Sequence, residues 1–596
     1  MAGILHSNKT YTIWDYIRIP LVVCPSYTLI KAINKIINAL VPSFQVLVTA
    51  KFIDTALIIF KDNTQYTKIW IPLLLLVAIV LYSYLNWSFM SYINLKFEMR
   101  MNQIFRTAIV EKRSKLEYCH VENNDSWDLI TRTCGDPAGR VSGGLDNILG
   151  AVELVVRVIS ILIILITQVW WAGLAIIAIS IPLFIIAFKG GKESYQAHKE
   201  AEKYNRRAGY LHGVLSGREN IEERALFGYT DAVNQQWYEK YEVARKINLK
   251  VNLKNFIRMK SSSLITVFIS ASIIVILLIP LSNGEITPGL FMGLVTATLG
   301  LVQMMSWQFS YITQQFANNR EYLKDLTAFM ALSETEGALD QPANHICFDS
   351  IEFKHVFFKY PDTEQFILKD FSLKLEKNLH YAFVGVNGAG KTTITKLLTG
   401  MYSGFDGDIL INGKDIRSYK LAELKALFAV VYQDFAKYYI PLEDNVALGN
   451  VLDKDNEKIE EAVSLIGLSS AVDKLSQGIK TPLGKIYEDG VDLSGGEWQR
   501  VAIARTLCNP AEVRILDEPT AALDPVAESK VYEMFSKISM GKSTIFITHR
   551  LGAARLADEI VVIDNGCVAE KGNHEALMKL GGIYSEMFES QRSWYQ

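Results

Sequence analysis

Long uncharged apolar runs in the first half of the chain constrain the fold more than any other feature. The runs Ile71 to Leu81 and Leu264 to Pro280 contain no charged residue. A lipid bilayer offers no water to satisfy backbone N–H and C=O groups, so a chain crosses it only as helices or as a closed barrel. One helical crossing needs about 20 apolar residues. These runs therefore predict a bundle of membrane-spanning helices.

The first half contains six candidate spans of this kind. They lie at residues 37–60, 69–90, 150–169, 172–188, 264–280 and 287–307. Polar excursions rich in Lys and Arg follow the second and the fourth span. Because cytoplasmic loops carry an excess of basic residues, we expect both excursions, both termini and the second half of the chain in the cytoplasm. The protein is then a multi-pass protein of a cell membrane, such as a bacterial inner or plasma membrane.

The two excursions are long enough to be helical extensions of the spans that end in short cross-pieces. Residues 122–130 and 218–228 are the expected contact points with the second half of the chain. The alternative is that these segments form a solvated charged face.

A polar segment, SETEGALDQPANH, separates the two halves. Beyond Asp349, strands of alternating pattern, such as 351–360, give way to alternating strands and helices, which is typical of an α/β layer domain. The sequence therefore predicts a transmembrane domain at 1–335, a linker at 336–348 and an α/β domain at 349–596.

Residues Gly385 to Thr392, GVNGAGKT, fit the phosphate-binding pattern G-x-x-x-x-G-K-[ST]. The pattern follows a short apolar strand, 380–384, and opens a helix at about 392–398, which is the strand, loop and helix order that such a loop requires. The loop backbone and the helix N-terminus bind phosphates, Lys391 reaches the terminal phosphates, and the Thr392 hydroxyl binds magnesium. The expected nucleotide-binding residues of this stretch are Gly385, Asn387, Gly388, Gly390, Lys391, Thr392 and Thr393.

The stretch VRILDEPTAALD, from Val513, is an apolar strand that ends in two adjacent acids. Asp517 is expected to hold magnesium, and Glu518 to activate the attacking water as a general base. An Asp-Glu pair alone is a weak signal.

Between these motifs lies LSGGEWQR, Leu493 to Arg500, which resembles the signature sequence of ATP-binding-cassette (ABC) proteins. Over the whole chain, six spans followed by one cassette resemble a half-transporter of the ABC exporter type, similar to bacterial peptide, lantibiotic or multidrug exporters. The resemblance implies ATP and Mg²⁺ as cofactors and hydrolysis of ATP. It also implies that two cassettes enclose two ATP molecules, so that each chain offers the other four signature residues: Ser494, Gly495, Gly496 and Glu497.

Three further residues match positions of the family. Tyr360, in FKYP, resembles the aromatic residue that stacks on adenine, although a tyrosine at a strand edge can be structural. Gln433, in VVYQDF, resembles the glutamine that joins magnesium and the attacking water. His549, in FITHR, resembles the histidine that contacts the γ-phosphate. The chain departs from the commonest family pattern at Glu497, Arg514 and Ala521, and none of these departures removes a phosphate or magnesium ligand.

The expected partners follow from charge and from the resemblance. A formal net charge of −2 gives no electrostatic case for nucleic acid. The presence of both Glu518 and His549 favours a homodimer, with a heterodimer as the alternative. The partners are then the lipid bilayer and an exported cargo.

Cargo identity is the least constrained property. Lys31, Lys35, Asn38 and Gln45 share one helical face leading into the first span, where they either line a cavity or meet the cytoplasmic leaflet. Glu153 and Arg157, one turn apart, fit a neutral structural pair. Span six and its extension carry a mixed polar and aromatic set that suits an amphipathic cargo or ordinary helix packing: Thr296, Gln303, Met304, Trp307 and Tyr311.

The predicted function is ATP-driven export of a peptide or an amphipathic small molecule by alternating access. Two alternatives share the fold: a lipid or glycolipid flippase, and an ATP-gated regulator or channel that moves no cargo uphill.

Overall fold

The chain folds into two compact units, and the first unit is not continuous in sequence. The computed structural model describes residues 5–7, 9–62, 66–168, 197, 200–201, 203–217, 220–343, 346–486, 488–519, 539 and 541–593. One unit comprises Met1–Arg113 and Asp125–Leu332, and the other comprises Ser114–Asn124 and Ser333–Gln596. The short segment Ser114–Asn124 lies inside the predicted transmembrane domain, residues 1–335, yet it packs with the second unit.

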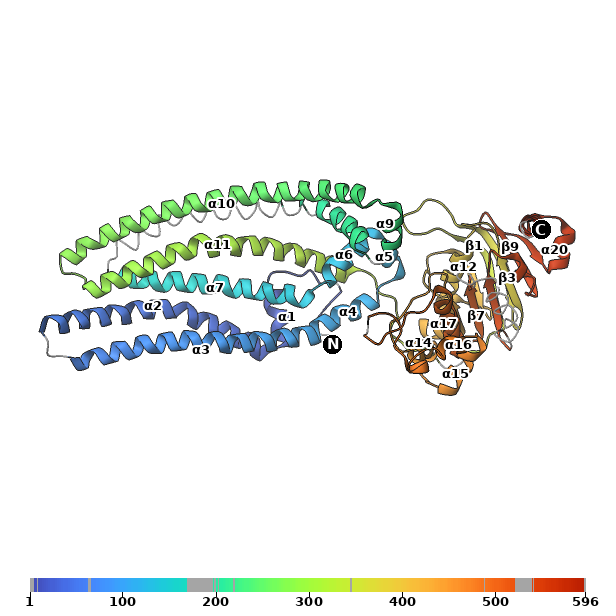
Figure 1. Ribbon diagram of the computed structural model, residues 1–596, viewed down its shortest axis with the longest axis horizontal. Coiled ribbons are helices and arrows are strands. Elements are labelled where there is room, and N and C mark those ends of the chain that lie inside the picture. Colours follow the sequence, from blue (N-terminus) through green and yellow to red (C-terminus); the bar gives the residue numbers. More distant parts are fainter. Residues whose placement is uncertain are drawn as a thin grey trace. The chain divides into compact units, whose positions relative to one another are not determined.

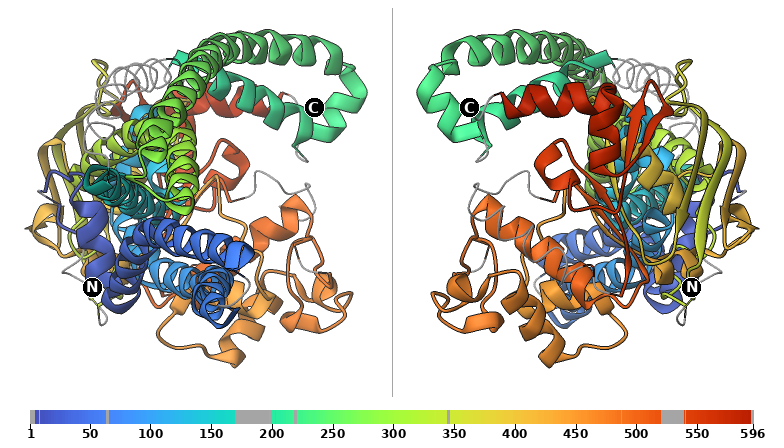
Figure 2. Two further views of the ribbon diagram at one scale, coloured as in Figure 1. Left: turned by 90° about the vertical axis from the view of Figure 1, so that its left-hand side faces the viewer. Right: turned by 90° about the vertical axis from the view of Figure 1, so that its right-hand side faces the viewer.

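The described portion of the first unit consists of helices, five of which have more than 30 residues (Figure 1). Helices α2 and α3 contact each other, and α2 also contacts α7 and α11. Seen end on, α2 and α3 lie side by side (Figure 2). The helices are α1 (Asp15–Val23), α2 (Pro25–Asp62), η1 (Tyr66–Ile69), α3 (Trp70–Met101), the π-helical turn η2 (Asn102–Arg106), α4 (Thr107–Ser114), α6 (Asn124–Cys134), α7 (Pro137–Gln168), a helical stretch at 203–216, α9 (Ile221–Phe227), α10 (Thr230–Ser282) and α11 (Pro288–Ala331).

The predicted spans lie in these helices. Three helices among the described residues are long and apolar enough to cross a bilayer: Pro25–Lys61, Tyr66–Ser114 and Pro137–Ile164. They contain the predicted spans 37–60 and 69–90 and much of 150–169. The spans 264–280 and 287–307 lie within α10 and α11, and 172–188 lies outside the described residues. The helical membrane fold is confirmed, and the count of six spans stays a prediction.

Helices α2 and α11 approach each other closely where α11 begins. Asp54 of α2 accepts hydrogen bonds from the Thr287 hydroxyl (2.6 Å) and from the Gly289 backbone N–H (2.7 Å). The carboxylate therefore satisfies a donor that the first turn of a helix leaves without an intrahelical partner. A Cβ atom on Gly289 would lie 2.1 Å from the Ala50 carbonyl oxygen, so the contact requires glycine.

The described residues of the second unit form two sheets. The six-stranded sheet has the order β10-β9-β3-β8-β7-β6 and is parallel except for β10, and the four-stranded sheet β2-β1-β4-β5 is antiparallel. The strands are β1 (Ser350–Phe358), β2 (Leu368–Glu376), β3 (His380–Val384), β4 (Asp406–Ile411), β5 (Lys414–Asp415), β6 (Phe428–Val431), β7 (Val513–Asp517), β8 (Ser543–Ile547), β9 (Glu559–Asp564) and β10 (Cys567–Gly572).

Helices connect and cover these strands. They are α5 (Tyr118–Glu122), α12 (Lys391–Leu398), η4 (Ile416–Ser418), α13 (Leu421–Leu427), α14 (Leu442–Ala447), η5 (Leu448–Asn450), α15 (Asn456–Leu465), α16 (Ser469–Val472), η6 (Gly478–Lys480), α17 (Gly495–Cys508), α19 (Leu551–Ala554), α20 (His574–Leu580) and α21 (Ile583–Arg592). The predicted strand 380–384 coincides with β3, and the predicted strand before the paired acids is β7.

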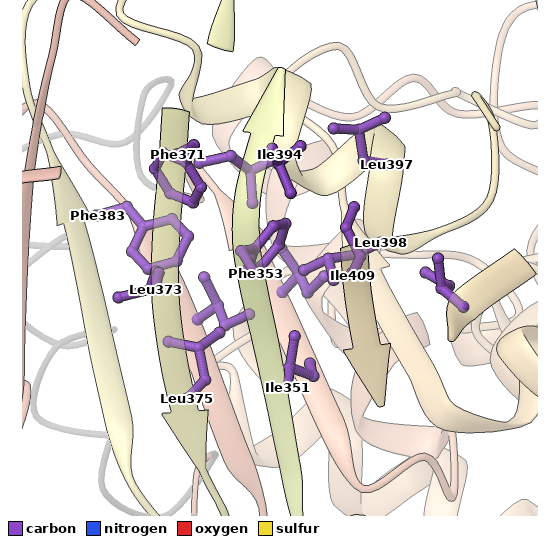
Figure 3. Packing of buried hydrophobic residues seen from close by; sticks show 14 of the residues in the cluster. Ile351, Phe353, Phe371, Leu373, Leu375, Phe383, Ile394, Leu397, Leu398 and Ile409 are labelled. Carbon is purple, nitrogen blue, oxygen red and sulfur yellow. The ribbon is translucent and has the colours of Figure 1, made fainter. Parts of the chain in front are cut away.

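The burial pattern of the side chains along each strand agrees with the pattern of apolar residues in its sequence. Every residue of β7 and β8 is buried, as expected for parallel strands covered on both faces, which read as continuous apolar runs. In contrast, buried and exposed residues largely alternate along β2. Phe353 and Phe371 pack edge to face, with ring centroids 5.3 Å apart, and Figure 3 shows them in the same core as Ile394 of α12. This core fixes α12 against the strands that flank it.

We expect Gly289→Ala to destabilise the membrane unit, because the added methyl group would overpack against the α2 backbone. Overpacking of this kind costs about 1–3 kcal/mol. Gly150→Ala in α7 is the control, because a Cβ there has no atom within 4 Å and alanine favours a helix over glycine by about 1 kcal/mol. Thermal unfolding in detergent should show a lower midpoint for Gly289→Ala only. Equal midpoints for the two variants would contradict the close contact.

Candidate functional site

Four neighbouring strands end at one edge of the six-stranded sheet. Strands β3, β8, β7 and β6 are adjacent and parallel, so their carboxyl ends lie together, where open α/β sheets bind ligands. Each end carries a residue predicted to be functional: Lys391 after β3, His549 after β8, Asp517 and Glu518 at the end of β7, and Gln433 after β6.

The loop between β3 and α12 requires its glycines. Gly385, Gly388 and Gly390 have φ values of 153°, 81° and 105°, which residues with a Cβ rarely adopt. A Cβ on Gly385 would also lie 2.1 Å from the Ile563 carbonyl oxygen. Asn387 is exposed. The loop therefore has the backbone conformation of an anion-binding turn in front of a helix N-terminus.

Lys391 is buried under this loop. Its Nζ donates hydrogen bonds to the carbonyl oxygens of Gly385 and Val386, both at 2.9 Å. Burial lowers the pKa of the ammonium group, and the nearby Glu518 and Asp517 carboxylates act in the opposite direction. The loop thus holds the Lys391 side chain next to the two acids.

Asp517 is a buried acid at the end of β7. Its exposed fraction is 1%, and neither carboxylate oxygen has a well-formed hydrogen bond among the described residues. Burial raises its pKa to about 6; the Thr392 hydroxyl and the Lys391 ammonium group oppose this rise, and Glu518 adds to it. A buried carboxylate without hydrogen bonds is costly unless a cation compensates it. The residue therefore fits a hard divalent cation, which takes oxygen ligands.

Glu518 and His549 form a pair beside Asp517. The Glu518 Oε1 and His549 Nε2 atoms are 3.1 Å apart. Burial lowers the pKa of His549, the Lys391 charge lowers it further, and Glu518 opposes both effects. The imidazole is thus neutral at pH 7. Glu518 has a left-handed backbone conformation (φ 49°), which is strained for a residue with a side chain.

Gln499 of α17 is a residue of the site that the sequence motifs did not single out. It is 2% exposed, and its Nε2 donates a hydrogen bond of 3.0 Å to the backbone carbonyl oxygen of Glu518. A second backbone contact, from the Glu518 N–H to the Ile547 oxygen (3.0 Å), ties the same residue to β8. These contacts hold the strained turn in place. The signal was present in LSGGEWQR, but only its first residues had an expected role.

Tyr360 lies next to the start of α12. Its hydroxyl and the Thr393 hydroxyl are 2.9 Å apart, and the tyrosine is half-buried while Thr393 is buried. The structure therefore brings the predicted adenine platform to the helix that begins with Lys391. Gln433, in contrast, is exposed on the loop after β6.

The signature residues lie at the start of α17. Ser494 and Glu497 form a capping box: the Ser494 Oγ accepts from the Glu497 N–H (3.3 Å), and the Glu497 Oε2 accepts from the Ser494 N–H (2.8 Å). Glu497 thus has a structural role where glutamine is commonest. Ser494 and Gly495 are exposed, and Gly496 is partly buried. Among the described residues, no hydrogen bond or ion pair joins residues 494–497 to residues 385–393.

The first unit contains a separate cavity between helices. Its volume is about 270 Å³, and its lining is Pro42, Gln45, Val46 and Thr49 of α2, Arg157 and Ile161 of α7, and Gly293, Thr296, Ala297 and Gly300 of α11. Of the predicted polar set on span six, Thr296 lines this cavity and Tyr311 is exposed. The side chains of Gln303, Met304 and Trp307 lie outside the described portion of the chain.

The polar face of α2 meets charges of α7 beside this cavity. Glu153 Oε1 is 2.6 Å from Arg157 Nη2, and Glu153 Oε2 is 2.9 Å from Lys35 Nζ. Lys31 Nζ is 2.7 Å from Asp146 Oδ1. Glu153 and Arg157 thus belong to a group of three charges with two cations.

Two family models match the chain. The model for the ABC transporter transmembrane region matches residues 28–305, and the model for the ABC transporter domain matches residues 368–521. Ala521, at which the chain departs from the commonest family pattern, lies outside the described residues.

Named relatives are similar over most of the chain. The subtilin transport ATP-binding protein SpaT of Bacillus subtilis is 29% identical and covers 93% of this chain and 90% of its own length. The ATP-dependent lipid A-core flippase of Alcanivorax borkumensis is 27% identical, over 81% of this chain and 82% of its own. The structure of a bacterial Atm1-family ABC exporter with ATP bound has a TM-score of 0.74 at 22% identity, covering 94% of this chain and 98% of that one. This last similarity concerns the fold.

We expect Asp517→Asn to stabilise the nucleotide-free protein above pH 6. The acid has a pKa of about 6 instead of 3.8, so the folded state binds its proton more tightly than the unfolded state does, and stability falls as pH rises from about 4 to 6. The difference corresponds to about 3 kcal/mol. Thermal unfolding at pH 5 and pH 8 should show that the wild type alone loses stability at pH 8.

The same variant should lose stabilisation by Mg²⁺, because the amide carries no charge to offset the cation. Thermal unfolding with ATP, with and without Mg²⁺, measures this loss. Asp473→Asn, at an exposed position after α16, is the matched control. An Mg²⁺ response of Asp517→Asn equal to that of the wild type would contradict the assignment.

Proposed function

The chain belongs to the ABC transporter family and has the fold of an ATP-driven exporter, and from this premise we propose that two copies of it export a peptide or an amphipathic small molecule. The observation that carries the proposal is the meeting of Lys391, Asp517 and the Glu518–His549 pair at one sheet edge.

The site residues then have distinct roles in ATP hydrolysis. Lys391 binds the terminal phosphates together with the loop N–H groups. Glu518 accepts the proton of the attacking water, and its turn is held by Gln499. His549, neutral at pH 7, offers its Nε2–H, which faces Glu518 at 3.1 Å, to the γ-phosphate. Tyr360 stacks on adenine.

Mg²⁺ is the cation that we propose for the Asp517 carboxylate. The two buried oxygens, which have no well-formed hydrogen bond to any described residue, support this choice. The Thr392 hydroxyl and the Gln433 amide would supply further oxygen ligands. The bound ion would neutralise phosphate charge during transfer.

A second copy completes each site. The exposed start of α17 offers backbone N–H groups to an anion, yet residues 494–497 make no hydrogen bond or ion pair with the phosphate loop in the described portion of their own chain. We therefore assign Ser494, Gly495, Gly496 and Glu497 to the ATP molecule held by Lys391 of the partner subunit. Because Glu518 and His549 are both present, a homodimer is the preferred assembly over a heterodimer.

The cargo assignment rests on the cavity of the first unit. Its wall combines apolar residues such as Val46 and Ile161 with the polar residues Gln45, Thr49, Thr296 and Arg157, which suits a molecule with both apolar and polar groups. The similarity to a subtilin transport protein supports a peptide, and the similarity to a lipid A-core flippase supports a lipid. Uptake of a labelled peptide by proteoliposomes, movement of labelled lipid headgroups, or ATP-dependent current without uptake would separate exporter, flippase and regulator.

The basic excursions support a topology with the ATP-binding unit and both termini in the cytoplasm. The host would be a bacterial inner or plasma membrane. Accessibility of a cysteine introduced into the second unit to an impermeant thiol reagent, in intact cells and in inverted vesicles, tests this orientation.

We expect Glu518→Gln to lower steady-state ATP turnover by roughly two to four orders of magnitude, the usual contribution of a general base, while ATP binding is retained. The measurement is phosphate release by the purified protein in lipid nanodiscs. Near-normal turnover of Glu518→Gln would remove Glu518 from the chemistry. Absence of turnover in the wild type would point to a missing partner subunit.

Two inactive variants should restore activity when they are mixed, if the sites are shared. Lys391→Ala and Gly495→Asp each disable both sites of their own homodimer. In a mixed dimer, one site combines an intact Lys391 with an intact signature, so turnover should return to about half of the wild-type value for dimers that contain both chains. Differently tagged chains purified by both tags provide the sample. Mixed dimers as inactive as the parents would contradict the shared site.

A further inference from the structure

A charged and aromatic cluster holds helix α5 against the rest of the second unit. Glu122, at the end of α5, lies between two side chains of this unit: its Oε1 is 2.6 Å from Lys396 Nζ, and its Oε2 accepts a hydrogen bond from the Tyr402 hydroxyl. Partial burial opposes ionisation of Glu122, but the hydrogen bonds from Lys396 and Tyr402 prevail and lower its pKa. The carboxylate is therefore ionised at pH 7 and holds both partners.

The same two partners also hold Tyr360. The Lys396 ammonium group lies over the rings of Tyr118 and Tyr360, 5.2 Å from each centroid. The Tyr402 ring makes edge-to-face contacts with Tyr118 (5.7 Å) and Tyr360 (5.5 Å). Glu122 of α5 and the predicted adenine platform Tyr360 thus share two neighbours, Lys396 and Tyr402, through ionic, cation–π and edge-to-face contacts that are each stabilising.

A second connection reaches the loop that carries Tyr360. Asn123, directly after α5, donates a hydrogen bond of 2.8 Å from Nδ2 to Asp362 Oδ2, and Asp362 is two residues beyond Tyr360. At its other edge Tyr360 contacts Thr393 on α12 (2.9 Å), the helix that also carries Lys396. The ring position therefore depends on α5 and on α12 together.

We propose that Glu122 and Lys396 are positioning residues for nucleotide binding, and that docking of α5 sets the affinity for ATP by fixing the Tyr360 ring. This inference rests on the proposed role of Tyr360. Coupling between two sites is reciprocal, so nucleotide binding strengthens the docking of α5 by the same factor.

The test compares charge variants of the pair by ATP affinity and turnover. Glu122→Lys and Lys396→Glu should each raise the Kd and the KM for ATP about tenfold and leave kcat within about twofold. The double variant restores an ion pair with its charges exchanged, so its Kd should return to within about threefold of the wild type. Glu122→Gln keeps the size of the side chain and should give an intermediate Kd, which keeps the test valid if a charge reversal fails to fold.

The matched control is the same exchange at Lys374 and Glu376, an exposed ion pair of 2.9 Å on β2. It should leave Kd and KM unchanged. A merely structural role of Glu122 and Lys396 would lower the thermal midpoint or kcat without a change in Kd, and that result would overturn the proposal.

Tyr360→Ala separates the role of Tyr360 in adenine binding from the coupling of Tyr360 to Glu122 and Lys396. If it weakens ATP binding while the Glu122 and Lys396 variants do not, the coupling is wrong and the adenine platform stands. If it leaves ATP affinity unchanged, the platform assignment is wrong, and the proposal fails with it.

Discussion

The parallel hydrogen-bonded register of β3, β8, β7 and β6 is the constraint on which the nucleotide chemistry depends. Parallel pairing places the carboxyl ends of all four strands at one edge, so residues separated by more than 100 positions meet there without long side chains. Asp517 is the last residue of β7, His549 follows β8, and Lys391 begins the helix that follows the loop after β3. A one-residue shift of β7 relative to its neighbouring strands would place the Asp517 side chain on the opposite face of the sheet.

This edge departs from what stability alone favours. Within the part of the chain that the structure describes, the buried Asp517 oxygens have no well-formed hydrogen bond. Glu518 has a strained backbone, and Lys391 is bound to carbonyl groups of its own loop. Local conflicts of this kind are typical of functional sites and are compensated elsewhere. Here the fully buried strands β7 and β8 and the core around Phe353 supply the compensation.

Local motifs made the residues near the strand ends predictable, because each motif begins with or directly follows an apolar run. The phosphate loop and the strand before the paired acids agree with β3, α12 and β7. Contacts between distant segments were not predictable in this way. The Gln499 contact to Glu518 depends on how α17 packs against the sheet. The Lys35 contact to Glu153 joins two residues that are 118 positions apart in the sequence and lie on different helices. Sequence spacing carries no information on such pairs, so the Glu153–Arg157 pair could only be interpreted as isolated.

The discontinuous second unit has a consequence for biosynthesis. Ser114–Asn124 leaves the ribosome before the membrane helices between it and Ser333, and about 210 residues separate the two segments of the unit. At 5–20 residues per second, this interval lasts roughly 10–40 s. Throughout it, Tyr118 lacks its neighbours Lys396 and Tyr402, which have not yet been synthesised. The segment Ser114–Asn124 must therefore be kept from misassembly after the preceding helices have entered the bilayer. A gene fragment that encodes only Ser333–Gln596 yields a cassette in which Tyr118 does not cover the Tyr402 ring.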